Sequence, residues 1–119
     1  MWNVEPTNDF ERRYRQFEKK NPNELRATLA NLQRYIDALN EGGKPEIIQF
    51  GFIHREPQGV VAIDQKGGGG NLKQTRLYAY AWMAGRVLHL ITIGDKQSQK
   101  SDLALCKSFV TELRKFHDQ

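Results

Sequence analysis

The side chains best suited to chemistry in this sequence are the arginines and lysines of its second half. Residues 60–119 contain nine Lys and Arg against five Asp and Glu, whereas residues 1–59 contain nine of each, so the net charge of +4 arises after residue 59. Guanidinium and ammonium groups gathered on one part of a fold attract polyanions such as nucleic acids. An excess of this size also serves solubility alone, so charge by itself leaves both interpretations open.

Two further features of this half could contribute to a binding surface. Four consecutive glycines occupy positions 67–70, between Lys66 and Lys73, but no Gly-Lys-Ser/Thr follows them as in a P-loop. They form either a flexible hairpin connection or a loop that moulds around an RNA backbone. Tyr78 and Tyr80 share one face of the next predicted strand, where they either stack on bases or fill the core.

The three histidines and the single cysteine give weaker signals. His54, His89 and His117 are far apart and form no i, i+4 pair, so we expect no zinc site. His89 falls in an apolar strand pattern, where it is either a general base or a packed core residue. We interpret Cys106, on the apolar face of the last predicted helix, as a small buried hydrophobe. A single cysteine also excludes an internal disulfide.

Periodicity predicts the elements that carry these residues. Strands are expected where β-branched and aromatic residues cluster, at residues 60–64, 76–80 and 87–93. The last of these is apolar on both faces, so we expect it inside the sheet with a helix on one side. Residues 83–86 suit a tight hairpin with Gly85 available for a positive φ. A polar turn over 94–100 leads into an amphipathic helix over 101–116.

The first half is predicted to be a helical hairpin after a short strand at residues 2–4. The first helix is capped within residues 7–9 and carries one apolar stripe, Phe10, Tyr14 and Phe17. The second starts with Asn21 as N-cap and Pro22 at its first position, and glycines 42–43 end it. Its predicted buried face comprises Leu25, Leu29, Leu32, Ile36 and Leu39. Residues 47–53 suit either a strand or a short helical turn.

The predicted order is therefore β-α-α-β-β-β-α. Helices that precede a block of strands favour the α+β class with an antiparallel sheet, here in one domain over residues 1–119. No apolar run approaches the roughly 20 residues of a membrane-spanning helix, and no signal-peptide pattern opens the chain. We expect a cytoplasmic protein that makes no membrane contact.

This order resembles the RelE/ParE toxin superfamily of bacterial type II toxin–antitoxin systems, and its HigB-like branch in particular. The matching segments are the Gly- and Lys-rich loop, the strand that begins Thr75-Arg76-Leu77-Tyr78, and the stretch Leu90-Ile91-Thr92-Ile93-Gly94-Asp95-Lys96. The resemblance implies a helical hairpin packed on a small sheet with a C-terminal helix. It also implies a ribosome-dependent endoribonuclease that cleaves messenger RNA and is held inactive by a cognate antitoxin protein.

The resemblance implies roles for particular residues as well. Arg76 and Lys96 match positions where nuclease members carry phosphate-binding cations, so both are predicted to be catalytic, with no metal or cofactor. Fixed cations of this kind stabilise the charge that develops on the phosphate and on the leaving 5′-oxygen. Supporting contacts to RNA are predicted for Lys66, Lys73, Tyr78 and Lys100.

One strand departs from the family pattern. Residues 60–64 are Val-Val-Ala-Ile-Asp, where family members usually carry Glu and Arg or several basic residues. Asp64 stands where an arginine is expected, and its carboxylate would repel a phosphate unless it points away or acts as a base. The departure favours an alternative hypothesis, a non-catalytic binding protein of the same fold that targets DNA gyrase or descends from a toxin.

Overall fold

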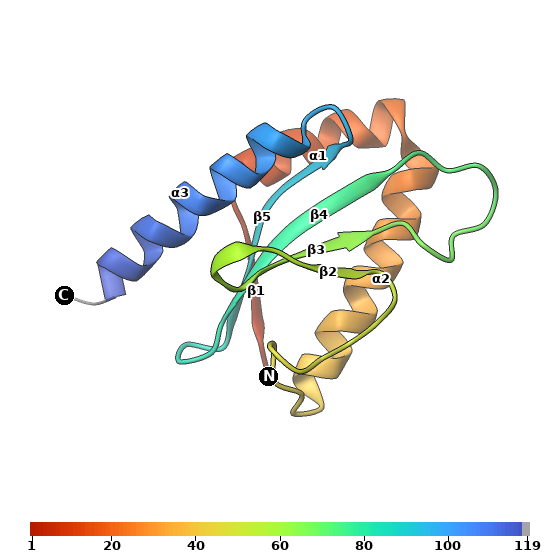
Figure 1. Cartoon of the computed structure of the whole chain (residues 1–119). Coiled ribbons are helices and arrows are strands. Elements are labelled where there is room, and N and C mark those ends of the chain that lie inside the picture. Colours follow the sequence, from red (N-terminus) through yellow and green to blue (C-terminus); the bar gives the residue numbers. More distant parts are fainter. Residues whose placement is uncertain (118–119) are drawn as a thin grey trace.

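The computed structural model describes residues 1–117 and shows an α+β protein, which confirms the predicted class (Figure 1). Its elements are β1 (Asn3–Pro6), α1 (Asn8–Lys20), α2 (Pro22–Asn40), β2 (Ile53–Arg55), a 3-10 turn η1 (Pro57–Gly59), β3 (Val60–Asp64), β4 (Thr75–Trp82), β5 (Val87–Asp95) and α3 (Gln99–His117). Residues 47–52, which fitted two alternatives, are turns and loop, and Ile53 begins β2. Within these residues no helix is long and apolar enough to cross a membrane.

The five strands form one mixed sheet in the order β1-β5-β4-β3-β2. Strands β2 to β5 are antiparallel to their neighbours, but β1 runs parallel to β5, with Asn3 opposite Val87. The prediction of an antiparallel sheet was therefore wrong at this edge. The reason is that β1 leads directly into α1, so its partner is the last strand of the chain rather than a strand joined to it by a tight turn.

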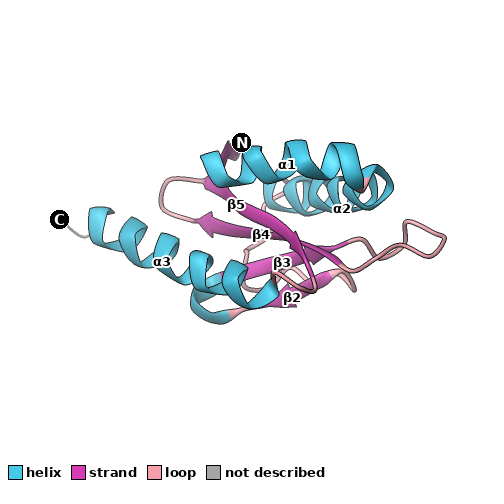
Figure 2. Ribbon diagram, turned by 90° about the horizontal axis from the view of Figure 1, so that it is seen from above, coloured by secondary structure: helices cyan, strands magenta, loops and turns pink. Residues whose placement is uncertain are grey.

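Helices cover both faces of the sheet. Figure 2 shows α1 and α2 on one face and α3 on the other. Both α1 and α3 contact β5, so this strand has a helix on each face, where the sequence predicted a helix on one. Because side chains alternate along a strand, β4 sends Leu77 and Ala79 toward α1 and α2, and Tyr78 toward α3. The result is two hydrophobic cores, one on each face.

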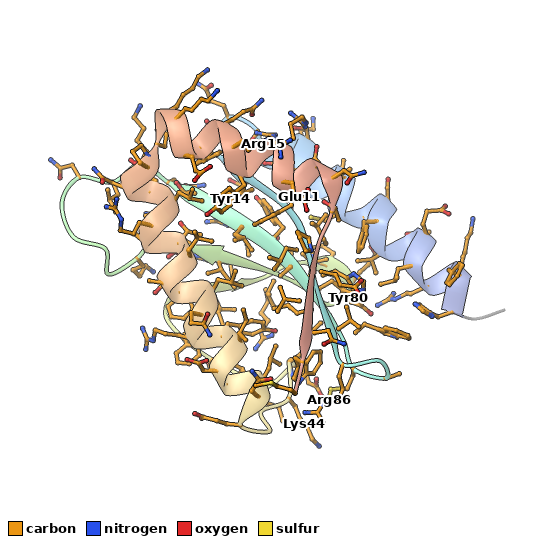
Figure 3. The ribbon with its side chains drawn as sticks, turned by 180° about the vertical axis from the view of Figure 1, so that it is seen from behind. Glu11, Tyr14, Arg15, Lys44, Tyr80 and Arg86 are labelled. Atoms are coloured by element: carbon orange, nitrogen blue, oxygen red, sulfur yellow. The ribbon has the colours of Figure 1, made fainter. Side chains whose placement is uncertain are left out.

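The start of α1 is tied to the sheet by Thr7. Its hydroxyl oxygen accepts a hydrogen bond from the N–H of Phe10 (3.0 Å) and donates one to the carbonyl of Ile91 (2.7 Å). The first bond satisfies a helix N–H that has no partner within the helix, as the sequence predicted. Phe10 and Phe17 are buried, and Tyr14 packs at the edge of the same core, beneath the helix in Figure 3.

The second helix follows α1 after one residue, Asn21. The side chain of Asn21 makes no capping hydrogen bond, contrary to the prediction, and its backbone N–H donates to the carbonyl of Phe17 (2.8 Å). A single linking residue thus closes the last turn of α1 before Pro22 opens α2. The buried face of α2 includes Leu25, Leu32 and Leu39, together with Thr28, Asn31 and Tyr35, which the pattern did not indicate.

In the hairpin between β4 and β5, Gly85 is required because a side chain at this position would clash, and not because its φ is positive. Arg86, not Gly85, has the positive φ, at 53°. A Cβ atom on Gly85 would lie 2.2 Å from Cζ3 of Trp82, so the ring of Trp82 occupies the place of a side chain. Arg86 lies over the ring of Trp2, which joins this hairpin to the N-terminal segment.

We predict that His89 makes stability sensitive to acid. Burial lowers the pKa of His89, with a further contribution from His117, whereas Glu5 opposes the shift. A histidine with a depressed pKa in the folded state binds protons more readily once unfolded, so its contribution is complete above the ordinary value of 6.5 and is lost as the pH falls. His89→Phe should keep the contact with Phe109 and remove this loss.

Urea unfolding of both proteins between pH 5 and 8 checks this prediction. The free energy of unfolding of the wild type should fall relative to that of His89→Phe as the pH decreases. A difference between the two proteins that is the same at every pH would show that His89 does not titrate on unfolding.

Candidate active site

Four polar side chains meet on the face of the sheet that α3 covers, and we name His54, Glu56, Asp64 and Arg76 the polar cluster. His54 on β2 pairs with Ala62 on β3, and Asp64 pairs with Arg76 on β4. Directly opposed residues point to the same face of a sheet, as do residues two apart along one strand. Register therefore brings His54, Asp64 and Arg76 to one face, and Glu56, just after β2, joins them through its contact with Arg76.

His54 and Asp64 form a tight pair within the cluster. Nε2 of His54 lies 2.6 Å from Oδ2 of Asp64, and the other carboxylate oxygen accepts the backbone N–H of Lys66 at 2.7 Å. The side chain of Asp64 is 8% exposed, and that of His54 is 32% exposed. A carboxylate that holds one imidazole nitrogen orients the ring and leaves the other nitrogen free to exchange a proton. His54 therefore has the arrangement of a general base or acid.

Arg76 and Glu56 form the second pair. Nη1 of Arg76 is 3.6 Å from Oε2 of Glu56, and the two side chains are 19% and 14% exposed. This is a loose contact, and Nε of Arg76 is buried without a hydrogen bond to the protein. Guanidinium carries five N–H donors in a planar fork, so Arg76 retains donors for a phosphate group. Its predicted catalytic role stays a prediction, now with a defined location.

Lys96 lies in the turn between β5 and α3, at the end of the sheet where β4 begins. Arg76 pairs with Gly94, two residues before Lys96. The turn is organised by Asp95, whose carboxylate accepts the N–H groups of Gln97 (3.0 Å) and Ser98 (3.1 Å). Lys96 is exposed, and within residues 1–117 no hydrogen bond or ion pair joins it to Arg76. The two predicted cations thus come from one end of the sheet without direct contact.

A buried carboxylate, Asp102, fixes this turn to both helix layers. It accepts a hydrogen bond from the hydroxyl of Ser98 (2.7 Å) and pairs with Nη2 of Arg13 on α1 (3.0 Å). Burial raises the pKa of Asp102, while Ser98 and Arg13 act in the opposite direction. A Cβ on Gly94 would lie 2.0 Å from Oδ2 of Asp102, so only glycine fits beside it. Asp102 links α1, the Lys96 turn and α3.

The other residues predicted to bind RNA divide into two groups. Lys66, Lys73 and Lys100 are exposed on loops or at the start of α3, where they are accessible to a polyanion. Tyr78 is completely buried in the core beneath α3, so its ring cannot stack on a base, and its predicted RNA contact was wrong. The strand pattern placed Tyr78 and Tyr80 on one face but did not show that α3 covers this face.

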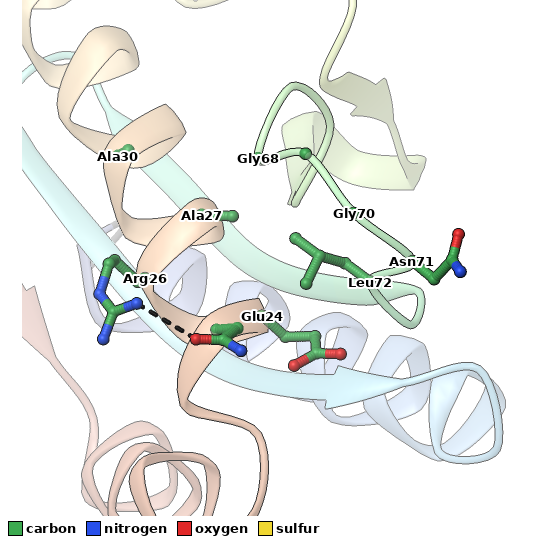
Figure 4. A pocket seen from close by; sticks show the side chains of 10 residues that line it. Glu24, Arg26, Ala27, Ala30, Gly68, Gly70, Asn71 and Leu72 are labelled. Atoms are coloured by element: carbon green, nitrogen blue, oxygen red, sulfur yellow. Dashed lines mark hydrogen bonds between the residues drawn. The ribbon is translucent and has the colours of Figure 1, made fainter.

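The glycine loop is packed against α2 rather than free. A Cβ on Gly68 would lie 2.5 Å from Cβ of Ala27, and the backbone N–H of Lys73 donates to the carboxylate of Glu24 (3.0 Å). Between the loop and α2 lies an open hollow of about 680 Å³, which Arg26 and Leu72 also line (Figure 4). No member of the polar cluster lines this hollow. The loop therefore forms a separate surface from the cluster.

No protein-family model, curated protein or solved structure matches this chain. Sequence reasoning located Arg76 but missed His54 and Glu56, since both precede the turn at Pro57 in a segment without a clear pattern. The available signal was their i, i+2 spacing, which places two titratable side chains on one face whenever the segment is a strand.

We predict that Gly94→Ala disrupts the Asp102 linkage. The added methyl group would displace Asp102 from Ser98 and Arg13, and overpacking of this kind costs about 1–3 kcal/mol of the free energy of unfolding. Gly51→Ala is a matched control, because a Cβ there meets no atom within 4 Å and its φ is not in the left-handed region. That control should change stability by less than about 0.5 kcal/mol. Equal effects of the two substitutions in urea unfolding would contradict the close approach at Gly94.

Proposed function

We propose that this chain is a toxin of the RelE/ParE type that cleaves messenger RNA on the ribosome and is neutralised by a cognate antitoxin protein. The sequence resemblance supports this proposal, together with the order of elements, in which two consecutive helices precede the strands β2 to β5. The single observation that carries it is the polar cluster. An oriented histidine and an arginine with free donors lie on one face, in a half of the chain with excess positive charge.

The cluster supplies the groups that RNA cleavage without a metal requires. A general base must accept the proton of a 2′-hydroxyl, and fixed cations must stabilise the charge that develops on phosphorus. The free Nδ1 of His54 is suited to the first role because Asp64 holds the opposite nitrogen at 2.6 Å. Arg76 is suited to the second, since its planar fork matches two phosphate oxygens.

The reaction balances with these groups. Nδ1 of His54 accepts the 2′-hydroxyl proton, the 2′-oxygen bonds to phosphorus, and the bond from phosphorus to the 5′-oxygen breaks. Lys96 donates a proton to the departing 5′-oxygen. His54 then releases its proton to solvent and Lys96 takes one up, so both groups return to their starting states. The products are a 2′,3′-cyclic phosphate on one fragment and a 5′-hydroxyl on the other.

The surroundings of Asp64 reduce the repulsion between its carboxylate and an RNA phosphate that its sequence position suggests. Both of its carboxylate oxygens already accept protein hydrogen bonds, one from His54 and one from the amide of Lys66. The group is buried, so an incoming phosphate does not contact it directly. The unusual residue on β3 thereby gains a role in orienting the base.

Exposed lysines on the loops of the second half of the chain recruit the polyanion. They lie on the glycine loop, on the turn after β5 and at the start of α3: Lys66, Lys73, Lys96 and Lys100. Each phosphate neutralised by such a cation releases counterions, so binding of RNA weakens as the salt concentration rises.

A non-catalytic binding protein of the same fold is the second candidate. The pairing of Arg76 with Glu56 favours it, because a carboxylate already beside the arginine competes with a phosphate. Under this hypothesis the lysines bind DNA gyrase or another partner and no RNA is cut. The two candidates therefore differ in whether His54 is needed.

We predict that induced expression in bacteria arrests growth and that His54→Ala or Arg76→Ala relieves the arrest. Loss of a general base lowers the rate of cleavage by about 10²-fold or more, and loss of a donor to the developing charge has an effect of about 10²–10³-fold. Arg15→Ala is the matched control, because Arg15 is exposed on α1, away from the α3-covered face, and should leave the arrest unchanged (Figure 3).

Cleavage is measured by primer extension on a messenger translated in vitro, with circular dichroism to verify that each variant is folded. Harmless expression of the wild type would contradict any toxin role. Arrest that persists in His54→Ala, with intact messenger and damaged DNA, would support the gyrase-directed alternative.

A further inference from the structure

A small pocket opens beside the polar cluster, between the turn that joins β2 to β3 and the helix α3. Its volume is about 230 Å³. Its walls are mainly apolar and include Pro57, Val60 and Leu103, whereas Glu56, Gln58 and Lys107 provide its polar groups. Drug-sized ligands occupy sites of roughly 300 Å³ or more, so this pocket suits a smaller group, either one ring or two fused rings.

The conformation of Gln58 is the first unusual feature of this pocket. Gln58 has φ 64° and ψ 24°, and the following Gly59 has φ 82°, so the turn has two consecutive left-handed residues. This geometry is that of a type I′ hairpin turn, in which Asn, Asp or Gly normally occupies the first position. Turn formation therefore does not explain a glutamine here. A non-glycine residue held in this region at a cost of about 1 kcal/mol or more suggests a use for its side chain.

The side chain of Gln58 is the second unusual feature. Its Oε1 atom is buried and makes no hydrogen bond within the protein. The backbone carbonyl of the same residue is occupied, since it accepts a hydrogen bond from Arg114 on α3 (3.1 Å). The turn is thus held in place from α3 while an acceptor on its side chain stays available. Unpaired buried polar atoms are rare in folded proteins, and each calls for a partner.

The pocket also adjoins the group that would bind phosphate. Glu56 lines the pocket and at the same time contacts Arg76 through Oε2 at 3.6 Å. Nε of Arg76 has no partner in the protein. A nucleotide could therefore place its phosphate on Arg76 and its base between the turn and α3. The base would meet two acceptors, Gln58 and Glu56, and one cationic donor, Lys107.

We propose that this pocket binds the base of the nucleotide whose phosphate Arg76 contacts, and that it selects guanine; this inference rests on the proposed RNA-cleaving function. Guanine presents two adjacent N–H donor groups on its Watson–Crick edge, which match the Gln58 and Glu56 oxygens, and its O6 and N7 acceptors match Lys107. Adenine places an unprotonated ring nitrogen against a carboxylate. Uracil has only one N–H donor on that edge.

The test is calorimetric titration of the whole protein with 3′-GMP, 3′-AMP, 3′-CMP and 3′-UMP. We expect 3′-GMP to bind at least about tenfold more tightly than the others, the discrimination that one well-placed pair of hydrogen bonds provides. Gln58→Gly should abolish this preference, because it removes the acceptor while glycine adopts the same φ without strain. Arg86→Gly is the matched control: it relieves a positive φ of 53° at a distant turn and should keep the preference.

The outcomes separate this inference from the function on which it rests. Equal affinity for all four nucleotides, or an unchanged preference in Gln58→Gly, would overturn the guanine pocket, even if the protein cleaves RNA at other bases. A guanine preference that Gln58→Gly removes would support the pocket, even if the wild type proves harmless and leaves RNA intact. Arg76→Ala should weaken the binding of all four nucleotides, since it removes the phosphate contact.

Discussion

The antiparallel register of β2, β3 and β4 is the constraint on which the rest of the structure depends. It places His54, Asp64 and Arg76 on the face covered by α3, and it sends Ile63 and Leu77 into the core beneath α1 and α2. A slip of one residue would exchange these two sets of side chains. Charged groups would then enter the larger apolar core, so burial of the hydrophobic residues and assembly of the polar cluster depend on the same pairing.

A second constraint on the structure is the ion pair between Arg13 and Asp102, which connects the two helix layers. Arg13 on α1 reaches Asp102 on α3 at 3.0 Å at the end of the sheet, and Gly94 leaves the space in which the carboxylate lies. Buried pairs of this kind contribute little net stability, but the loss of one partner is costly. They therefore specify one arrangement of the elements. Here that arrangement positions the Lys96 turn next to the start of β4.

The electrostatics of the site separate recruitment from chemistry. Exposed lysines on the loops attract a polyanion over a distance, whereas the cluster itself contains two carboxylates, one arginine and one histidine. With His54 neutral, the one arginine does not offset the two carboxylates, so the cluster itself does not attract a polyanion over a distance. Its value lies in the orientation of a proton acceptor beside a phosphate-binding group. The left-handed backbone of Gln58, next to the cluster, costs stability, as expected for a residue that serves recognition.

Local patterns in the sequence determined the helices, the long strands, the α+β class and the presence of cations in the second half. Residues 7–9 marked the start of α1, and alternation placed Tyr78 and Tyr80 on one face, because these signals depend on neighbours within a few residues. Only the tertiary structure decided the parallel pairing of β1, the existence of β2, the burial of Tyr78 and the contact of His54 with Asp64. Each of these depends on which distant segment lies opposite, and the hydrophobic period that identifies a strand carries no information about its partner.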